Sequence, residues 1–238
     1  MSFLKAEWRK LIMVNYEVSP EVLKNYLPKG TELDFYNGKC YVSLVGFMFK
    51  KTKLLGVKIP FHSDFEEVNL RFYVKRKINN EVKRGVVFIK EIVPKPALTF
   101  VANTIYKENY VTLPMSHKWE ENHNIMDIEY SWKLNNNQNF MKVTADKISN
   151  EIEKNSEIEF IAEHYWGYSK GVKNETTEYE VKHVKWKYYP IKTHTVSVNF
   201  EVNYGLEFNF LNNKEPSSVM LLEGSGISVE NKRIIKNK

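Results

Sequence analysis

The sequence predicts a single mainly β domain, built on one closed or strongly curved, mostly antiparallel sheet with a few short helices. Short segments that alternate apolar and polar residues recur along the chain, and such alternation is typical of strands. Segments with helical spacing are few and short. No repeat, linker or change of composition divides the 238 residues. We therefore expect one domain over residues 1–238, with its core at about 6–229 and a frayed basic tail.

The beginning of the chain is expected to form a strand over residues 8–14. Ser19-Pro20 then predicts the start of a short helix, because serine side chains cap helix N-termini and proline suits the first turn. Residues 31–36 and 39–49 are predicted to form a hairpin. The turn between them is Asn37-Gly38, a dipeptide that adopts positive φ at low cost.

Residues 60–110 carry the clearest local pattern. Apolar side chains at every second position predict a strand around residues 68–74, and a second strand is expected at 85–89 after a turn at 78–81. The apolar residues of 96–107 follow a proline and recur at helical spacing, which predicts a helix. The order of elements in this region is therefore strand, turn, strand and helix.

The remainder is expected to consist of short elements. The expected segments are an extended stretch at 110–115, a polar loop at 117–123, a hairpin over 126–143 around Asn135-Asn136-Asn137, a helix at 156–165 opened by a capping box of Ser156 and Glu159, a loop at 167–174, and strands at 178–187, 193–202, 217–223 and 226–229.

Composition excludes several classes of protein. The net charge of +6 comes from lysines scattered along the chain, which fits solvated surfaces, with a polyanion-binding surface as the alternative. The single cysteine, Cys40, excludes an intrachain disulfide and fits a cytoplasmic protein. No apolar run reaches the ~18 residues of a membrane helix. No glycine-rich phosphate loop is present, so no cofactor is expected.

Two sequence patterns are typical of catalytic sites, a nucleophile motif and a metal-binding motif. Residues 167–171 match the pattern G-x-S-x-G, which requires a strand, a sharp turn and then a helix. Here a helix is expected before the motif and a strand after it, so a hydrolase with Ser169 as nucleophile is not favoured. The six histidines include no H-E-x-x-H motif and no pair four residues apart, so no metal site is expected.

A row of polar side chains interrupts the strand around residues 68–74. Glu67, Asn69, Arg71 and Tyr73 share one face, because residues two apart point to the same side of a strand. In a half-buried sheet this row would face water. In a closed barrel it would line the interior, where Arg71 could bind a carboxylate through two hydrogen bonds and Glu67 would have a shifted pKa.

Lys95 is a second candidate for chemistry. It lies between Pro94 and Pro96, at the start of the predicted helix. A lysine forms a Schiff base with a keto substrate when burial or a nearby cation lowers its pKa. The alternative is an ordinary surface lysine at a helix start.

Several separated segments carry a resemblance to a known family. The segments are FEEVNLRFYV (65–74), RGVVFIKEIVPKPA (84–97), EHYWGY (163–168), Glu180-Val181-Lys182-His183 and Leu222-Glu223-Gly224-Ser225. Together they resemble the YqjF-like domain-of-unknown-function family, which is grouped with acetoacetate decarboxylase by fold. The resemblance runs from about Ala6 to Val229. It implies one domain built on a cone-like, mostly antiparallel β-barrel with peripheral helices, and it implies no established activity.

Acetoacetate decarboxylase itself is similar only remotely. Its segment with an active-site glutamate looks like Phe65-Glu66-Glu67, which implies this role for Glu67. Its reactive lysine lies in a Gly-aromatic-Pro-Lys-Lys run, and the nearest match places Lys95 at the first lysine. Pro96 stands at the second lysine, so the neighbour that would lower the pKa of the first is missing.

These observations predict a protein that binds a small acidic or keto-bearing organic molecule inside a barrel, with decarboxylase-like or other lyase-like chemistry. The alternatives are a non-catalytic binding module of the same fold and a polyanion-binding surface. We expect a small-molecule ligand, no membrane and no nucleic acid as partners; a homo-oligomer is compatible with the sequence. The candidate residues are Glu67 and Lys95 for catalysis, and Arg71, Tyr73, Tyr165, Trp166 and Tyr168 for binding the substrate.

Overall fold

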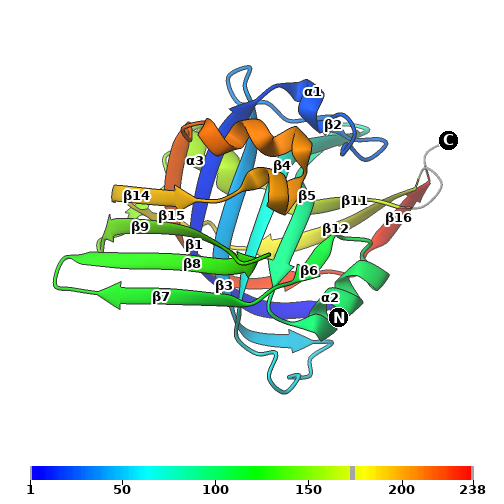
Figure 1. The fold of residues 1–238 in the computed structure, drawn as a ribbon. Coiled ribbons are helices and arrows are strands. Elements are labelled where there is room, and N and C mark those ends of the chain that lie inside the picture. Colours follow the sequence, from blue (N-terminus) through cyan, green and yellow to red (C-terminus); the bar gives the residue numbers. More distant parts are fainter. Residues whose placement is uncertain (1, 172–174, 237–238) are drawn as a thin grey trace.

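A computed structural model describes residues 2–171 and 175–236, which fold into two β-sheets with a few short helices (Figure 1). The predicted mainly β class is confirmed. None of the helices in the described ranges has the length and apolar character needed to cross a membrane.

The larger sheet has twelve strands and the smaller has four. The larger contains β1 (Leu4–Val18), β2 (Glu32–Leu33), β3 (Cys40–Leu54), β4 (Phe65–Ile78), β5 (Glu81–Val93), β6 (Tyr110–Thr112), β10 (Asn150–Glu151), β11 (Trp166–Lys170), β12 (Glu175–His183), β13 (Lys187–Tyr189), β15 (Ser218–Val229) and β16 (Arg233–Lys236). The smaller contains β7 (Met115–Glu121), β8 (Ile125–Leu134), β9 (Asn137–Asp146) and β14 (Ile191–Ser197). The helices are α1 (Pro20–Leu23), α2 (Pro96–Ile105), α3 (Glu157–Ala162), α4 (Phe200–Tyr204) and the 3-10 helix η1 (Leu206–Asn213).

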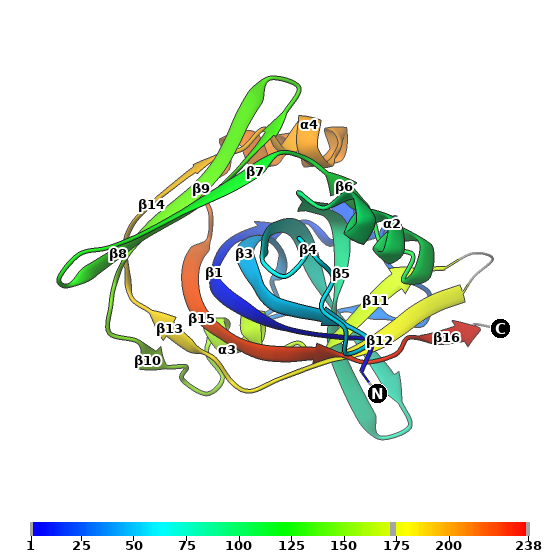
Figure 2. The ribbon, with the colours of Figure 1, turned by 90° about the horizontal axis from the view of Figure 1, so that it is seen from below.

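Strand pairing in the larger sheet returns to its starting strand. Hydrogen bonds connect β15, β1, β3, β4, β5, β11 and β12 in that order, and β12 pairs again with β15 through Val181 and Val229. Most of these pairs are antiparallel, whereas β11 and β6 each run parallel to β5. Figure 2 shows the same strands curving around one centre, with α2 beside them.

Both faces of the larger sheet are buried, against two separate hydrophobic clusters. On one face of β4, Val68 and Leu70 pack in a cluster with Tyr130 and Trp132 of the smaller sheet. On the other face, Tyr73 belongs to a second cluster inside the ring. Each fully buried large apolar side chain contributes roughly 1.5–3 kcal/mol. The polar row on β4 therefore lies inside the molecule and not on its surface.

The three helices predicted from the sequence are present. Ser19 caps α1 by accepting a hydrogen bond from the Glu21 amide, and Ser156 caps α3 by accepting one from the Glu159 amide at 3.2 Å. Pro96 occupies the first turn of α2. The β4–β5 and β8–β9 hairpins also form as expected.

Some expected loops are strands. Residues 117–123 lie largely in β7, which pairs with β8 at the edge of the smaller sheet. Edge strands carry many polar side chains, which explains why this segment has the composition of a loop. Residues 166–170 form β11, and residues 172–174 of the predicted loop lie outside the described residues. In the tail, 233–236 are not frayed but pair with β12 as β16.

Two further boundaries differ from expectation. The hairpin predicted around Asn37-Gly38 is reduced to one bridge between Tyr36 and Lys39, because Glu32 and Leu33 pair with β4 instead. The strand expected at 193–202 ends at residue 197, and α4 follows it. In the first case pairing with the distant strand β4 replaces the predicted local pairing. In the second case Asn199 caps α4, so a helix begins where the alternation predicted a strand.

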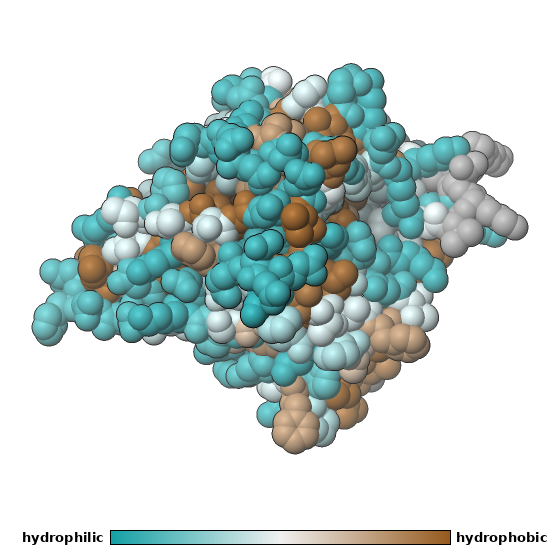
Figure 3. All heavy atoms as spheres, viewed as in Figure 1, coloured by the Kyte–Doolittle hydropathy of each residue, from teal (hydrophilic) through white to brown (hydrophobic). Residues whose placement is uncertain are grey.

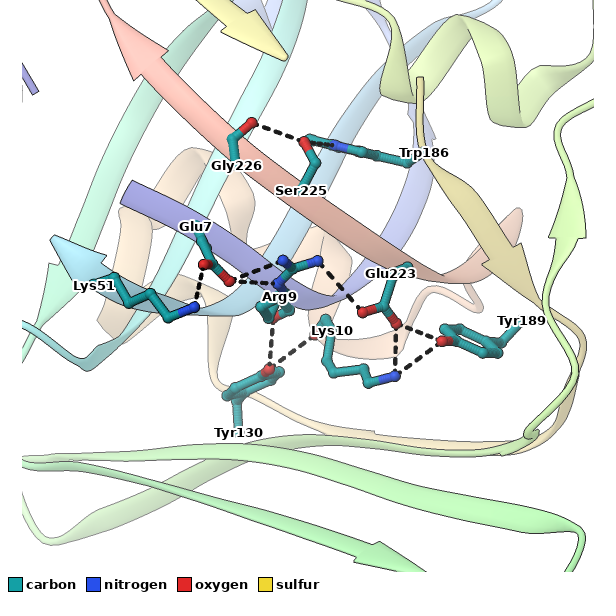
Figure 4. Close-up of polar contacts among 10 residues, drawn as sticks. All are labelled: Glu7, Arg9, Lys10, Lys51, Tyr130, Trp186, Tyr189, Glu223, Ser225 and Gly226. Carbon is teal, nitrogen blue, oxygen red and sulfur yellow. Dashed lines mark hydrogen bonds and ion pairs between the residues drawn. The ribbon is translucent and has the colours of Figure 1, made fainter. Parts of the chain in front are cut away.

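A polar network holds β1 where its register against β3 shifts (Figure 4). Lys10 adopts a positive φ of 54°, and its ammonium group lies 2.7 Å from Glu223 of β15. Tyr130 of β8 donates its hydroxyl to the Lys10 carbonyl at 2.8 Å. Arg9 pairs with Glu7 at 2.8 Å. These contacts join the smaller sheet to the irregular part of β1.

Gly224 of β15 lies opposite Arg9 at this irregularity and provides a test of the fold. Its φ is +80°, and an added Cβ would lie 2.0 Å from the Trp8 carbonyl oxygen. We expect Gly224→Ala to lower the free energy of unfolding by about 2 kcal/mol or more, measured by denaturant unfolding. Gly226→Ala is the control, because a Cβ there meets nothing within 4 Å. Equal stability of the two variants would contradict this interpretation.

Candidate functional site

The interior of the strand ring contains a cavity of about 270 Å³. Strands β1, β3, β4, β5, β11 and β12 provide much of its wall, and α2, the loop after β3 and the segment before β6 also contribute. Its lining includes three glutamates, Glu67, Glu91 and Glu108, and one arginine, Arg71. The cavity thus brings together ionisable groups from segments that are up to 41 residues apart.

A break in strand register places Glu91 in the cavity. Arg71 pairs with Phe88, but the preceding Leu70 pairs with Lys90, so one extra residue is accommodated in β5. Both Phe88 and Glu91 then face the cavity although they are three residues apart, which simple alternation forbids. Glu91 lies opposite Asn69 of β4 and next to Tyr110 of β6.

Hydrogen bonds connect the carboxyl groups to tyrosines and an amide. Glu67 accepts from the Asn69 side chain at 2.9 Å and from the Tyr110 hydroxyl at 3.2 Å. Glu108 accepts from the Tyr179 hydroxyl at 2.8 Å. These donors orient the two carboxyl groups without neutralising them. One carboxyl oxygen of Glu91 is buried with no hydrogen-bond partner among the described residues.

All three carboxyl groups bind protons more tightly than free glutamate. Burial raises the pKa of Glu67 to about 7, against a smaller opposite effect of its hydrogen bonds and of Arg71. Burial, with the charge of Glu67 adding to it, raises the pKa of Glu108 to about 8. Burial also raises the pKa of Glu91, and Glu108 and Glu67 raise it further. Near neutral pH the cavity therefore holds protonated carboxyl groups that can donate hydrogen bonds.

Arg71 is a buried cation with few partners. Its guanidinium donates to the Ile161 carbonyl at 3.4 Å and lies 3.9 Å from the Met13 sulfur. Its Nε is buried and has no hydrogen-bond partner, and no ion pair within 2–171 and 175–236 includes it. A buried arginine normally has a hydrogen-bonded anion, because an isolated charge in an apolar interior is costly. Arg71 therefore has free capacity to bind an anion.

His164 lines the cavity as a neutral ring. Its Nε2 lies 3.3 Å from Asp34, which also accepts a hydrogen bond from Arg84 at 2.6 Å. Burial lowers the pKa of His164 to about 4 despite this carboxylate. The positive charge next to the cavity thus comes from Arg71 and not from His164.

Aromatic side chains form much of the remaining wall. Trp8, Trp166 and Trp186 all line the cavity. Trp186 is held by a hydrogen bond from its indole nitrogen to Ser225 at 2.9 Å (Figure 4), and His183 stacks on it. Lys83 lies over the Trp166 ring, 3.7 Å from its centroid, and is paired with Glu178. This wall is largely apolar and is fixed by contacts outside the cavity.

The structure brings some of the candidate residues together. Glu67, Arg71 and Trp166 line the cavity. The other three aromatic candidates are not among its lining residues, because each points elsewhere. Tyr73 shares a hydrogen bond with Ser43, Tyr165 bonds Glu163, and Tyr168 is buried in the cluster under the smaller sheet.

Lys95 lies outside the cavity lining as well. It precedes α2 as a partly exposed residue, and its carbonyl accepts the Thr99 amide. In the part of the chain that the structure describes, no lysine lines the cavity.

Sequence reasoning missed Glu91, Glu108, Tyr110 and Tyr179. A charged residue within the apolar run of β5 was the available signal for Glu91. The sequence contained no such signal for Glu108 and Tyr179, because their proximity depends on how the segment before β6 and β12 meet in space.

Two other motifs have structural roles. Ser169 lies within β11, buried, and donates its hydroxyl to the Tyr106 carbonyl at 2.7 Å, so it does not sit on a nucleophile turn. Over the described ranges, no three His, Cys, Asp or Glu side chains are arranged to hold a metal ion.

Comparison with solved structures gives chains of the same fold. Acetoacetate decarboxylase from Legionella pneumophila matches with a TM-score of 0.67 and 12% identity, over 98% of this chain and 86% of that one. The enduracididine biosynthesis enzyme MppR complexed with pyruvate matches with a TM-score of 0.68 and 12% identity, over 98% and 91%. An acetoacetate decarboxylase-like enzyme from Sphingomonas wittichii matches with 0.67 and 9% identity, over 100% and 95%. At these identities the likeness establishes the fold alone.

Sequence comparison identifies the family. The uncharacterized protein YqjF of Bacillus subtilis is 33% identical over 76 residues, and this match spans 31% of each chain. The model of the family DUF2071, described as an uncharacterized conserved protein, matches residues 5–225. The chain therefore has the acetoacetate decarboxylase-like fold and belongs to the DUF2071 family.

Proposed function

We propose that the ring of strands forms a barrel and that its interior cavity binds a small organic molecule with a carboxylate or keto group. The single observation that carries this proposal is Arg71, a buried guanidinium with an unpartnered Nε and no ion pair within the described ranges. Guanidinium binds carboxylate through two parallel hydrogen bonds. The complex of MppR with pyruvate, a protein of the same fold, supports a ligand of this class.

The acidic residues fit the same ligand in their protonated forms. A neutral Glu67 or Glu108 can donate a hydrogen bond to a keto oxygen. Ionised carboxylates would instead repel the ligand. The raised pKa values of both residues therefore favour binding at neutral pH.

The polyanion-binding alternative has less support. Many of the lysines and arginines scattered along the chain are paired with acidic side chains. The pairs include Lys75 with Asp34, Arg76 and Lys83 with Glu178, Lys77 with Glu32, Lys185 with Glu159, and Lys187 with Glu151. Such pairing leaves little concentrated positive potential for a polyanion.

A second candidate function is lyase-like acid–base catalysis in the same cavity. The observation that favours it is the pKa of Glu67, about 7, because a general base works best when its pKa lies near the operating pH. Glu67 would remove a proton next to the keto group while Arg71 stabilises the negative charge that develops. This route needs no lysine, and Lys95 has no part in it.

The arginine is tested by substitution. We expect saturating pyruvate to raise the melting temperature of the native protein by about 5 °C or more, and Arg71→Met to abolish this shift. Methionine keeps much of the volume but cannot bind an anion. Arg233→Met, at an exposed position of β16, is the control and should respond like the native protein. A full shift in Arg71→Met would refute the proposed role.

The carboxyl groups predict how binding depends on pH. Between pH 6.5 and 9, Glu67 and Glu108 lose their protons, because their pKa values are about 7 and 8, and the added charges repel the ligand's carboxylate. We expect the dissociation constant for pyruvate, measured by calorimetry, to rise at least about tenfold. The double variant Glu67→Gln/Glu108→Gln should lose most of this rise, and Glu201→Gln, exposed on α4, should keep it. An unchanged pH profile in the double variant would argue against these assignments.

Catalysis is tested by proton exchange. In D₂O a general base exchanges the methyl protons of pyruvate, which is followed as loss of the methyl signal in proton NMR. We expect exchange above the buffer rate, and Glu67→Gln to slow it by about 100-fold or more. Exchange at the buffer rate with native protein would remove the catalytic candidate and leave the binding function standing.

A further inference from the structure

The glutamates and the arginine of the cavity come from neighbouring parts of its wall. Glu67 and Arg71 come from β4, Glu91 from the neighbouring β5, and Glu108 from the segment just before β6, which pairs with β5. The Tyr110 hydroxyl of β6 donates a hydrogen bond to Glu67 at 3.2 Å and so links β6 to β4. Burial lowers the pKa of His164 to about 4 and also lowers the pKa of His183, and both histidines line the cavity. The rest of the wall therefore carries little charge.

Helix α2 supplies a purely apolar part of this wall. Ala97, Leu98, Val101 and Ala102 line the cavity, and their spacing places them on one face of the helix. No residue of α2 is fully buried, and Leu98 of this face packs only partly against the cluster inside the ring. An apolar helix face that borders a cavity gains stability when an apolar group fills it.

The loop after β3 extends the apolar wall to the surface. Leu54, the last residue of β3, and Ile59 of the loop line the cavity, while Val57 and Phe61 of the loop are 61% and 90% exposed. Figure 3 shows hydrophobic side chains gathered at this lower end of the molecule. Apolar surface thus continues from the cavity wall outward.

We infer that the ligand is an amphipathic monocarboxylate, whose acid or keto-acid head meets Arg71 and the carboxyl cluster and whose apolar body of about six to ten carbons lies against α2 and the loop after β3. The cavity of about 270 Å³ is larger than the ~150 Å³ that holds a benzene ring. A three-carbon acid such as pyruvate would occupy only the charged end. This inference rests on the proposed function and adds to it the chemical class of the ligand's body.

A chain-length series tests the body of the ligand. Dissociation constants are measured by calorimetry at pH 6.5 for 2-keto acids of three, four, six, eight and twelve carbons. Each buried methylene should tighten binding about fourfold until the cavity is filled. Equal affinity across the series would overturn the inference while leaving the proposed function intact, and absence of binding by every acid would refute both. The dissociation constants of octanoate and 2-ketooctanoate are also compared. This comparison shows whether the carboxylate alone is recognised or the keto group as well.

A filled cavity gives an independent test. Ala102→Phe places a ring in the space against α2, and the substitution should be tolerated because no α2 residue is fully buried. We expect affinity for 2-ketooctanoate to fall at least tenfold and affinity for pyruvate to change less than twofold. Thr104→Phe, exposed on the same helix and outside the cavity lining, should leave both unchanged. Equal loss for the two ligands, or no loss for either, would contradict the placement of the apolar body.

Discussion

Burial of both faces of β4 is the constraint on which the rest of the structure depends. One face packs under the smaller sheet and the other faces the interior of the strand ring. The alternating sequence of this strand would suit a sheet with one wet face, where its polar row would cost nothing. Because the ring and the smaller sheet both exclude water, Glu67 and Arg71 are 2% and 8% exposed. Their charges must then be stabilised or suppressed by neighbours.

The electrostatics of the cavity follow from that burial. Burial of three neighbouring carboxyl groups raises their pKa values, so near neutral pH they retain protons that glutamate in water would lose. Arg71 lies on the same strand four residues from Glu67, too far along the strand for a direct ion pair, and its Nε stays unpartnered. An apolar core would be more stable than this arrangement. Such a concentration of poorly paired ionisable groups is typical of binding and catalytic sites.

The sequence was sufficient for elements set by local chemistry and insufficient for those set by distant contacts. Alternation and turn residues predicted the β4–β5 hairpin, and serine caps predicted α1 and α3. Glu67 and Arg71 were found because they lie on one strand face. Glu91 was hidden by the extra residue in β5, which reverses the alternation. Glu108, in the segment before β6, and Tyr179 of β12 meet although they are 71 residues apart in the sequence. The β7 segment resembled a loop because an edge strand is polar.

The positions of Arg71 and Lys95 bear on two kinds of chemistry, namely anion binding by a guanidinium and Schiff-base formation by an amine. A Schiff base needs an amine that loses its proton, whereas guanidinium stays charged at any physiological pH and forms no such bond. Arg71 lines the cavity, and Lys95 lies beyond it at the start of α2. Among the described residues the cavity lining thus offers a guanidinium and carboxyl groups, which the proposed binding and proton exchange would use, whereas Lys95 is not part of that lining. In this cavity Arg71 would select the head of the ligand and the apolar face of α2 its body, so specificity would come from two separate segments of the chain.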